Sequence, residues 1–259
     1  MNKQNIQDLF DISGKVALVT GATGGFGTTA VNALAAAGAK VMATARTASK
    51  LEAIVKDIRE AGGQAAFSVG DPVNYDDVRR VVKDTVDAFG GLDILITAAG
   101  VNKVSPIIDQ PVEDWEEVMD VNLKGTWLFC KESGRVMIAQ GRGGKVLLVS
   151  STRGMLGMAR YGAYSPSKAA VNLLAKSLGC EWGPYKVNVN AIAPTVFRTN
   201  LTQWMFDDQA FYKTFLARIP IGRLGEPEDF IGAVIFLSSR ASDFMTGSVL
   251  YVDGGYTAG

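Results

Sequence analysis

The chain has 259 residues, of which 47% are hydrophobic and 20% are charged, so it can build one large hydrophobic core. The 26 basic and 26 acidic side chains cancel to a formal net charge of zero, which excludes the basic footprint of a nucleic-acid-binding protein. The absence of histidine excludes Ser-His-Asp triads and histidine-ligated zinc, so we expect proton transfer by other side chains and no metal site.

The N-terminal extension, residues 1–12, is too polar for a signal peptide. No run of about 20 apolar residues is free of charges and glycine-rich breaks, so we expect no membrane span and no membrane partner. Cys130 and Cys180 lie in apolar periodic stretches, where buried reduced thiols are favoured over a disulfide or a nucleophile. These features predict a cytoplasmic protein.

Apolar, strand-like runs alternate with segments of helical period along the chain. The expected strands are residues 15–20, 40–44, 65–69, 92–97, 145–149, 187–193 and 248–252. The expected helices follow the glycine-rich residues 21–27 up to Gly38, and then cover residues 49–61, 75–89, 112–140, 164–182 and 227–238. Continuously apolar strands that alternate with helices are typical of parallel βαβ units. We therefore predict a single Rossmann-like α/β domain over residues 1–259, with a doubly wound sheet of seven parallel strands.

One long segment, residues 195–224, has no clear period and follows the sixth strand. It must therefore lie at the carboxyl edge of the sheet, where such folds bind ligands. A loop of this length is usually a lid or a binding loop, so we expect it to cover the substrate.

A glycine-rich turn joins the first strand to the first helix. Gly21, Gly25 and Gly27 follow Thr20 in the spacing G-x-x-x-G-x-G. Glycine lets the backbone approach a pyrophosphate closely, and the helix N-terminus then offers free N–H groups to the phosphates. A plain tight turn is the alternative, but the position between a strand and an apolar-striped helix favours dinucleotide binding.

Tyr164 and Lys168 are four residues apart and share one face of a helix. Pro166 lies between them and is tolerated only in a first turn, which puts Tyr164 at the start of the helix. A nearby ammonium favours the phenolate and lowers the pKa of a tyrosine, and a shift of about two to three units is within reach of one close cation such as Lys168. An isolated pair of this kind would more often be an exposed tyrosine beside a solvated lysine.

Several motifs, in order along residues 13–255, resemble those of the short-chain dehydrogenase/reductase family. The glycine turn and the segment TAAG at 97–100 resemble the family's cofactor motifs, although the family usually has Asn-Asn-Ala-Gly at the second. Asn122 lies in the family signature VNLKG, and YSPSK at 164–168 matches Tyr-x-x-x-Lys. Ser151 precedes Tyr164 by thirteen positions, as in the family, and DGG at 253–255 matches a C-terminal signature.

The resemblance implies a catalytic tetrad. Tyr164 would donate a proton to the carbonyl oxygen in reduction or remove it in oxidation, and Ser151 would hydrogen-bond the same oxygen. Lys168 would lower the pKa of Tyr164 and hold the nicotinamide ribose hydroxyls. Asn122 would hold a water in a proton relay to Lys168, and its alternative role is that of a helix-kink residue. Ser150 competes with Ser151, which the family spacing favours.

The resemblance also implies a nicotinamide dinucleotide. NAD-preferring relatives end the second strand with an acid, but here Ala45 occupies that position and Arg46 follows. Arginine suits a 2′-phosphate, so NADP(H) is favoured and NAD(H) is possible. Asp71 resembles the family's adenine-contacting acid, although the next residue, Pro72, has no N–H to donate. The expected cofactor contacts are Gly21, Thr23, Gly25, Phe26, Gly27, Arg46, Asp71, Ala99, Gly100, Tyr164, Lys168, Pro194, Val196 and Thr199.

The substrate pocket is less well defined. The candidate contacts are Arg153, Met155, Leu156, Tyr161, Phe197, Trp204 and Met205. Arg153 could pair with a carboxylate of the substrate, with solvent and a neighbouring subunit as alternatives. The aromatic and methionine side chains of the lid could instead pack on the core.

The whole chain most resembles reductases of sugar acids, polyols and small ketones, so we predict hydride transfer between a nicotinamide cofactor and a small ketone or secondary alcohol. A 3-oxoacyl-[acyl-carrier-protein] reductase is the alternative. A dinucleotide-sensing regulator is the alternative of another class, which the complete tetrad disfavours. The resemblance further implies a homotetramer that associates through the fourth and fifth helices and the C-terminal segment.

Overall fold

Seven parallel strands form one sheet in the order β3-β2-β1-β4-β5-β6-β7. They are β1 (Val16–Thr20), β2 (Lys40–Ala45), β3 (Gln64–Val69), β4 (Ile94–Thr97), β5 (Gly144–Val149), β6 (Val187–Pro194) and β7 (Val249–Val252). The computed structural model describes residues 3–199 and 202–259. The strand order reverses between β1 and β4, and such a switch point opens a crevice at the carboxyl ends of the strands. The predicted Rossmann-like sheet of seven parallel strands is confirmed.

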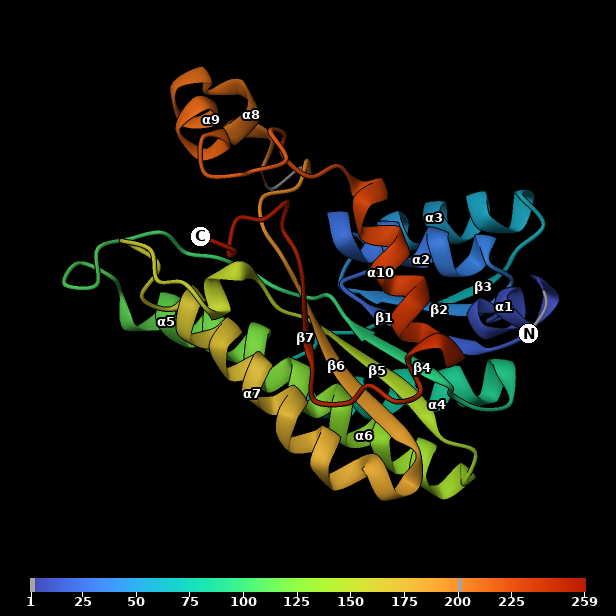
Figure 1. The fold of residues 1–259 in the computed structure, drawn as a ribbon. Helices are drawn as coiled ribbons and strands as arrows, with labels where there is room; N and C mark the ends of the chain where they lie inside the picture. Colours follow the sequence, from blue (N-terminus) through green and yellow to red (C-terminus); the bar gives the residue numbers. More distant parts are fainter. Residues whose placement is uncertain (1–2, 200–201) are drawn as a thin grey trace.

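Helices cover both faces of the sheet and make three layers (Figure 1). Those on one face are α2 (Gly25–Ala36), α3 (Ala48–Glu60) and α10 (Pro227–Ser238), and those on the other are α4 (Tyr75–Phe89), α6 (Gly125–Gln140) and α7 (Tyr164–Trp182). The sheet packs against each helical layer through a separate apolar core. Leu34, Val55 and Phe230 lie in the first core, and Val82 and Met137 lie in the second.

Local signals place the ends of several helices where the sequence predicts them. The Asn74 side chain accepts hydrogen bonds from the N–H groups of Asp76 and Asp77 and so caps the start of α4. Gly38, which follows α2, has a φ of +85°, a left-handed conformation that glycine adopts without strain.

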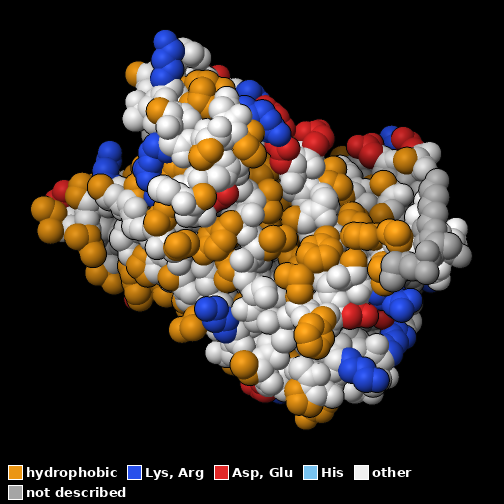
Figure 2. All heavy atoms as spheres, viewed as in Figure 1, with side chains coloured by type: hydrophobic (Ala, Val, Ile, Leu, Met, Phe, Trp, Pro, Cys, Tyr) orange, Lys and Arg blue, Asp and Glu red, His pale blue; other side chains and the backbone are white. Residues whose placement is uncertain are grey.

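Three segments differ from the sequence prediction. The N-terminal extension contains a helix, α1 (Lys3–Phe10), and the Phe10 ring lies 6.5 Å from the ring of Phe236 in α10. The expected long helix over 112–140 is divided into α5 (Val112–Met119) and α6 by a π-helical turn, Asp120–Lys124. The expected irregular lid contains α8 (Gln203–Asp207) and α9 (Gln209–Leu216), which stand out from the body of the molecule (Figures 1 and 2).

The two cysteines are both free thiols, as predicted, but they differ in exposure. Cys130 is buried in α6, and burial raises the pKa of its thiol to about 12. Cys180 is exposed near the end of α7, so the prediction that it is buried was wrong. Among the described residues, no helix combines the length and the apolarity that crossing a bilayer requires.

Candidate active site

The glycine turn packs too closely for side chains. A Cβ atom on Gly27 would lie 2.0 Å from the carbonyl oxygen of Gly21, and one on Gly21 would lie 2.5 Å from the backbone nitrogen of Ala99. Gly21 also has a φ of +61°. The residue before α2, Gly24, offers no side-chain cap, so the first N–H groups of the helix have no side-chain acceptor. Phe26 is half-buried and packs its ring against Phe197 and Phe230.

A cavity of about 320 Å³ extends from this turn along the carboxyl ends of β1, β2 and β4. Its lining residues are Thr20, Gly21, Thr23, Gly24, Thr44, Ala45, Arg46, Thr47, Lys50, Gly70, Pro72, Ala98, Ala99, Gly100, Val101, Val121 and Phe129. Arg46 and Lys50 are its two cations, and none of these lining residues is acidic. Because the uncapped helix end and the cations suit phosphates, the residues present fit the pyrophosphate and adenosine parts of a dinucleotide.

Two details of this cavity differ from the sequence prediction. The Asp71 carboxylate accepts a hydrogen bond from the Val73 N–H, and Asp71 is not among the lining residues, whereas its neighbours Gly70 and Pro72 are. One carboxylate oxygen, Oδ1, is thus used within its own turn, and the expected adenine contact stays a prediction. Lys50 is an additional cation of the cavity that is not among the cofactor contacts expected from the sequence. Its position four residues after Arg46, in the first turn of α3, indicates that it can lie near the same phosphate.

The catalytic candidates come together at the switch between β5 and α7. Tyr164 is the first residue of α7, with Pro166 in the first turn as predicted. The Lys168 Nζ lies 5.7 Å from the centroid of the Tyr164 ring and donates a 2.9 Å hydrogen bond to the carbonyl of Val149. Ser151 hydrogen-bonds Tyr164 through its side chain.

Ser150, the competitor for Ser151, has another role. Its hydroxyl donates a 3.1 Å hydrogen bond to the carbonyl of Lys168 and so fastens the end of β5 to α7. The Ser151 hydroxyl remains near Tyr164, which supports the choice of Ser151.

Burial controls the pKa values of the catalytic pair. Burial raises the pKa of Tyr164 to about 12, and this effect exceeds the opposing hydrogen bond from Ser151 and charge of Arg153. Burial also lowers the pKa of Lys168 to about 8. In the protein alone the pKa of Tyr164 is therefore raised rather than lowered, and the influences that oppose the rise come from Ser151 and Arg153, while the Lys168 ammonium is turned toward the Val149 carbonyl.

Asn122 is buried in the π-helical turn and holds the loop after β4. Its Oδ1 accepts a 2.8 Å hydrogen bond from the Val101 N–H, and its Nδ2 donates to the Val101 carbonyl and to the Ser167 hydroxyl, both at 3.0 Å. A Cβ atom on Gly100 would lie 3.3 Å from Asn122 Oδ1 and 3.5 Å from Lys168 Nζ. Asn122 thus lies at the helix kink and also close to Lys168, as both of its expected roles require.

The loop after β6 closes over the glycine turn. A Cβ atom on Gly25 would lie 2.3 Å from Cγ2 of Thr199, so the expected contacts from the two loops are neighbours. The Thr199 N–H donates to Thr202 Oγ1 at 3.0 Å, and the Val196 carbonyl accepts from the Gly225 N–H at 3.0 Å. Pro194 ends β6 immediately before this loop.

The substrate candidates divide into three groups. Tyr161 lies beside the reacting group, with its ring centroid 6.0 Å from that of Tyr164, and Met155 is exposed. Phe197 is only 2% exposed and packs in the core, and it borders a separate cavity of about 180 Å³ whose lining residues include neither Tyr164 nor Ser151. Met205 is also buried, in a small apolar cluster of the lid that Leu156 packs against. The side chain of Trp204 lies outside the described residues.

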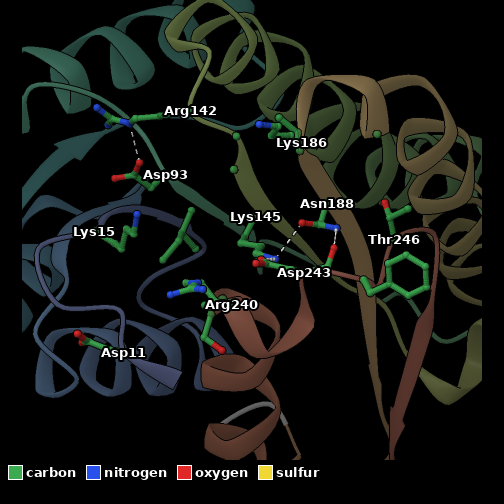
Figure 3. A pocket seen from close by; sticks show the side chains of 18 residues that line it. Asp11, Lys15, Asp93, Arg142, Lys145, Lys186, Asn188, Arg240, Asp243 and Thr246 are labelled. Atoms are coloured by element: carbon green, nitrogen blue, oxygen red, sulfur yellow. Dashed lines mark hydrogen bonds and ion pairs between the residues drawn. The ribbon is translucent and has the colours of Figure 1, made fainter. Parts of the chain in front are cut away.

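The largest cavity described, about 740 Å³, is not near these residues. It opens at the amino ends of β1, β4, β5 and β6, which is the opposite edge of the sheet (Figure 3). Two ion pairs lie within it: Arg142 Nε lies 2.9 Å from Asp93, and Lys145 Nζ lies 2.8 Å from Asp243 and also 2.8 Å from the neutral side chain of Asn188. We therefore assign the chemistry to the carboxyl edge.

Comparison with known proteins agrees with this geometry. Residues 21–257 match a family model described as enoyl-(acyl carrier protein) reductase. An uncharacterised oxidoreductase of Mycobacterium tuberculosis is 48% identical, with 96% of this chain and 93% of the relative covered. Gluconate 5-dehydrogenase of Gluconobacter oxydans is 36% identical, over 96% of this chain and 97% of the relative.

Solved structures give the same result. A gluconate 5-dehydrogenase from Burkholderia cenocepacia, in complex with NADP and tartrate, superposes with a TM-score of 0.95 at 34% identity and covers 98% of this chain and 99% of that one. With the glycine turn, the tetrad residues and the fold in register, the chain belongs to the short-chain dehydrogenase/reductase family of oxidoreductases that act on CH–OH groups.

Proposed function

We propose that the protein transfers hydride between NADP(H) and a small ketone or secondary alcohol, with a sugar acid or a related polyol as substrate. The observation that carries the proposal is the meeting of the Ser151 and Tyr164 hydroxyls beside Lys168, at the edge of the sheet that holds the dinucleotide cavity. Relatives named gluconate 5-dehydrogenase support the substrate class.

The residues have separate roles in this reaction. A bound nicotinamide dinucleotide would supply the hydride in reduction and accept it in oxidation. Ser151 orients the reacting oxygen, and Tyr164, which is protonated at neutral pH with a pKa of about 12, donates the proton that the new alcohol needs. In the oxidation direction Tyr164 must first lose that proton, and Lys168 and Asn122 provide the polar path behind it.

Two lines support NADP(H) over NAD(H). The cavity presents Arg46 and Lys50 without a carboxylate that would repel a 2′-phosphate. The Burkholderia relative was also crystallised with NADP.

We further propose a homotetramer, and we retain a cytoplasmic location as a prediction from the sequence. The support for assembly is a set of large apolar side chains that are exposed on one group of helices: Trp115 of α5, Trp127 of α6 and Leu173 of α7.

A 3-oxoacyl-[acyl-carrier-protein] reductase is the second candidate, because the matching family model is named for a reductase of enoyl groups on an acyl carrier protein. The test is NADPH and NADH consumption with 5-keto-D-gluconate, cyclic ketones, diketones and 3-oxoacyl thioesters. We expect turnover with the keto sugar acid. Turnover with the 3-oxoacyl thioesters alone would show that the second candidate function is the correct one.

The Tyr164→Phe variant tests the chemistry itself. We expect turnover to fall about 10²- to 10⁴-fold, because the variant lacks the proton donor, while NADPH binding measured by fluorescence is retained. Full turnover by this variant would contradict the mechanism, and an absence of turnover in both proteins would favour a dinucleotide-sensing regulator.

A further inference from the structure

Arg153 is a buried cation that lacks an anion. It follows Ser151 in the short helical turn Thr152–Gly154 and is only 7% exposed. Its Nη1 donates a 3.3 Å hydrogen bond to the carbonyl of Gly157, and its Nη2 donates to the hydroxyl of Tyr256. Within residues 3–199 and 202–259, no carboxylate forms an ion pair with it.

This arrangement is unusual on physical grounds. Buried charged side chains are nearly always paired, because desolvation of an isolated ion is costly. A guanidinium has five N–H donors, and here two of them meet neutral acceptors. The positive charge of Arg153 is therefore left without a counterion among the residues that the structure describes.

The backbone of Arg153 contacts the reacting group, and the charge of its side chain acts on Tyr164. The backbone N–H of Arg153 donates a 3.1 Å hydrogen bond to the Ser151 hydroxyl, and its positive charge is one of the influences that lower the pKa of Tyr164. A second guanidinium, that of Arg218, lies 4.6 Å from the centroid of the Tyr256 ring, while Arg153 lies 5.2 Å from it. The surroundings of Tyr256 are thus strongly positive.

We propose that Arg153 binds a carboxylate of the substrate and makes the enzyme selective for keto acids over neutral ketones. The inference rests on the proposed function and adds the determinant of substrate class. The planar guanidinium matches a carboxylate in two parallel hydrogen bonds, and the exclusion of water from this buried position strengthens them. Neutral polyols and thioesters cannot supply the missing charge.

A purely structural role for Arg153 has a distinct signature. Tyr256 is buried and stacks on Phe215 of α9, with ring centroids 5.0 Å apart, so Arg153 could serve only to fasten the C-terminal segment beneath the lid. Removing the Tyr256 hydroxyl in Tyr256→Phe breaks that fastening but keeps the charge of Arg153. Arg153→Gln keeps an N–H donor but removes the charge.

The experiment compares two matched ketones. L-sorbose is 5-keto-D-gluconate with the carboxylate replaced by CH₂OH, so the ratio of their kcat/KM values isolates the carboxylate. We expect the wild type to prefer the acid by at least about tenfold, and Arg153→Gln to reduce this preference about 10- to 100-fold, as expected for a charge-assisted hydrogen bond. Tyr256→Phe should retain the preference, and Arg153→Lys should be intermediate.

Inhibition by tartrate provides a second readout, and its inhibition constant should rise by a similar factor in Arg153→Gln. An unchanged preference in that variant would overturn the proposal. If Arg153→Gln does not fold, a wild type without preference for the acid overturns it equally. If the enzyme reduces both ketones equally well, the carboxylate site is wrong but the proposed reaction stands. If tartrate binding depends on the charge of Arg153 but no ketone is reduced, the proposed reaction is wrong but the carboxylate site stands.

Discussion

Lys168 and Tyr164 illustrate how burial decides the protonation of an active site. Each side chain is shifted toward its neutral form: the pKa of Lys168 falls to about 8 and that of Tyr164 rises to about 12, in both cases chiefly through burial. The proximity of the two residues follows from their spacing on a helix. The sign of the shift does not, because it depends on how much water the surrounding loops remove.

The pKa of Lys168 predicts how stability changes with pH. Its folded value of about 8 is below the ordinary value of 10.5, so between these two pH values the unfolded chain holds a proton that the folded chain has lost. Stability therefore rises with pH in this window, by about 1.4 kcal/mol per pH unit. Below about pH 8 both states are protonated and the contribution is constant.

Urea denaturation of the cofactor-free protein checks this prediction against Lys168→Met. The difference in the free energy of unfolding, wild type minus variant, should rise by about 1 kcal/mol between about pH 8 and pH 9. The raised pKa of Cys130 makes stability fall as pH rises above about 9. Because Cys130 is present in both proteins, its contribution cancels in the difference. A difference that does not vary with pH would refute the assignment.

Arg46 and Lys50 predict the coenzyme preference. Replacing Arg46 with Ala should raise the KM for NADPH about 10- to 100-fold, because the 2′-phosphate loses a charge-assisted hydrogen bond, and should change the KM for NADH much less. Lys50→Ala should act in the same direction. Lys56→Ala is the control, since Lys56 is an exposed cation on the same helix that does not line the cavity. Equal effects on both coenzymes would contradict the role of Arg46.

At the scale of single residues, sequence reasoning identified motif-bound groups and missed those that depend on tertiary context. Ser151 was preferred over Ser150 on spacing, and the hydrogen bond of Ser150 to α7 gives the physical reason. The burial of Phe197 arises from packing between distant segments, which no motif encodes. The hydrogen bond of Asp71 to the Val73 N–H depends on the conformation of one local turn, which the motif does not specify.

At the scale of elements, long apolar strands and helices were predictable, whereas short or interrupted ones were not. α8 and α9 have five and eight residues, too few for a clear helical period. The π-helical turn at Asp120–Lys124 leaves the apolar pattern of its neighbours intact, so the sequence suggested one long helix. The insertion lies at Asn122, where its side chain can hold Val101 and Ser167 together.

The contact between α6 and α7 gives a prediction about packing. A Cβ atom on Gly134 of α6 would lie 2.6 Å from Cη2 of Trp182, a buried ring at the end of α7. Gly134→Ala should therefore destabilise the fold by about 1–3 kcal/mol, despite the better helix propensity of alanine.

The control for this variant is Gly232 in the middle of α10, where an added Cβ meets no atom within 4 Å. Gly232→Ala should stabilise the protein by about 0.5–1 kcal/mol through helix propensity alone. Thermal or urea denaturation measures both. If Gly134→Ala were as stable as Gly232→Ala, close packing of α6 against the Trp182 ring would be ruled out.

At the scale of the whole molecule, the topology was predictable because parallel strands with crossover helices allow few arrangements. The surface was less predictable, because exposed apolar side chains show no periodic pattern in the sequence that would distinguish a subunit interface from scattered apolar residues. Figure 2 shows one face of the molecule, on which apolar atoms also extend along the edge formed by α5 and α7. Leu173 of α7 is 64% exposed, and Trp127 of α6 is nearly half exposed.

These side chains make the proposed tetramer testable. Replacing Leu173 and Trp127 with Asp together should reduce the mass measured by light scattering at micromolar concentration, because two charges buried in an apolar interface are unpaired. Ile6→Asp on α1, a half-exposed position at the other side of the molecule, should leave the mass unchanged. A wild type that is already monomeric would refute the proposed assembly. Loss of mass in Ile6→Asp alone would instead move the interface to the face that carries α1 and α10.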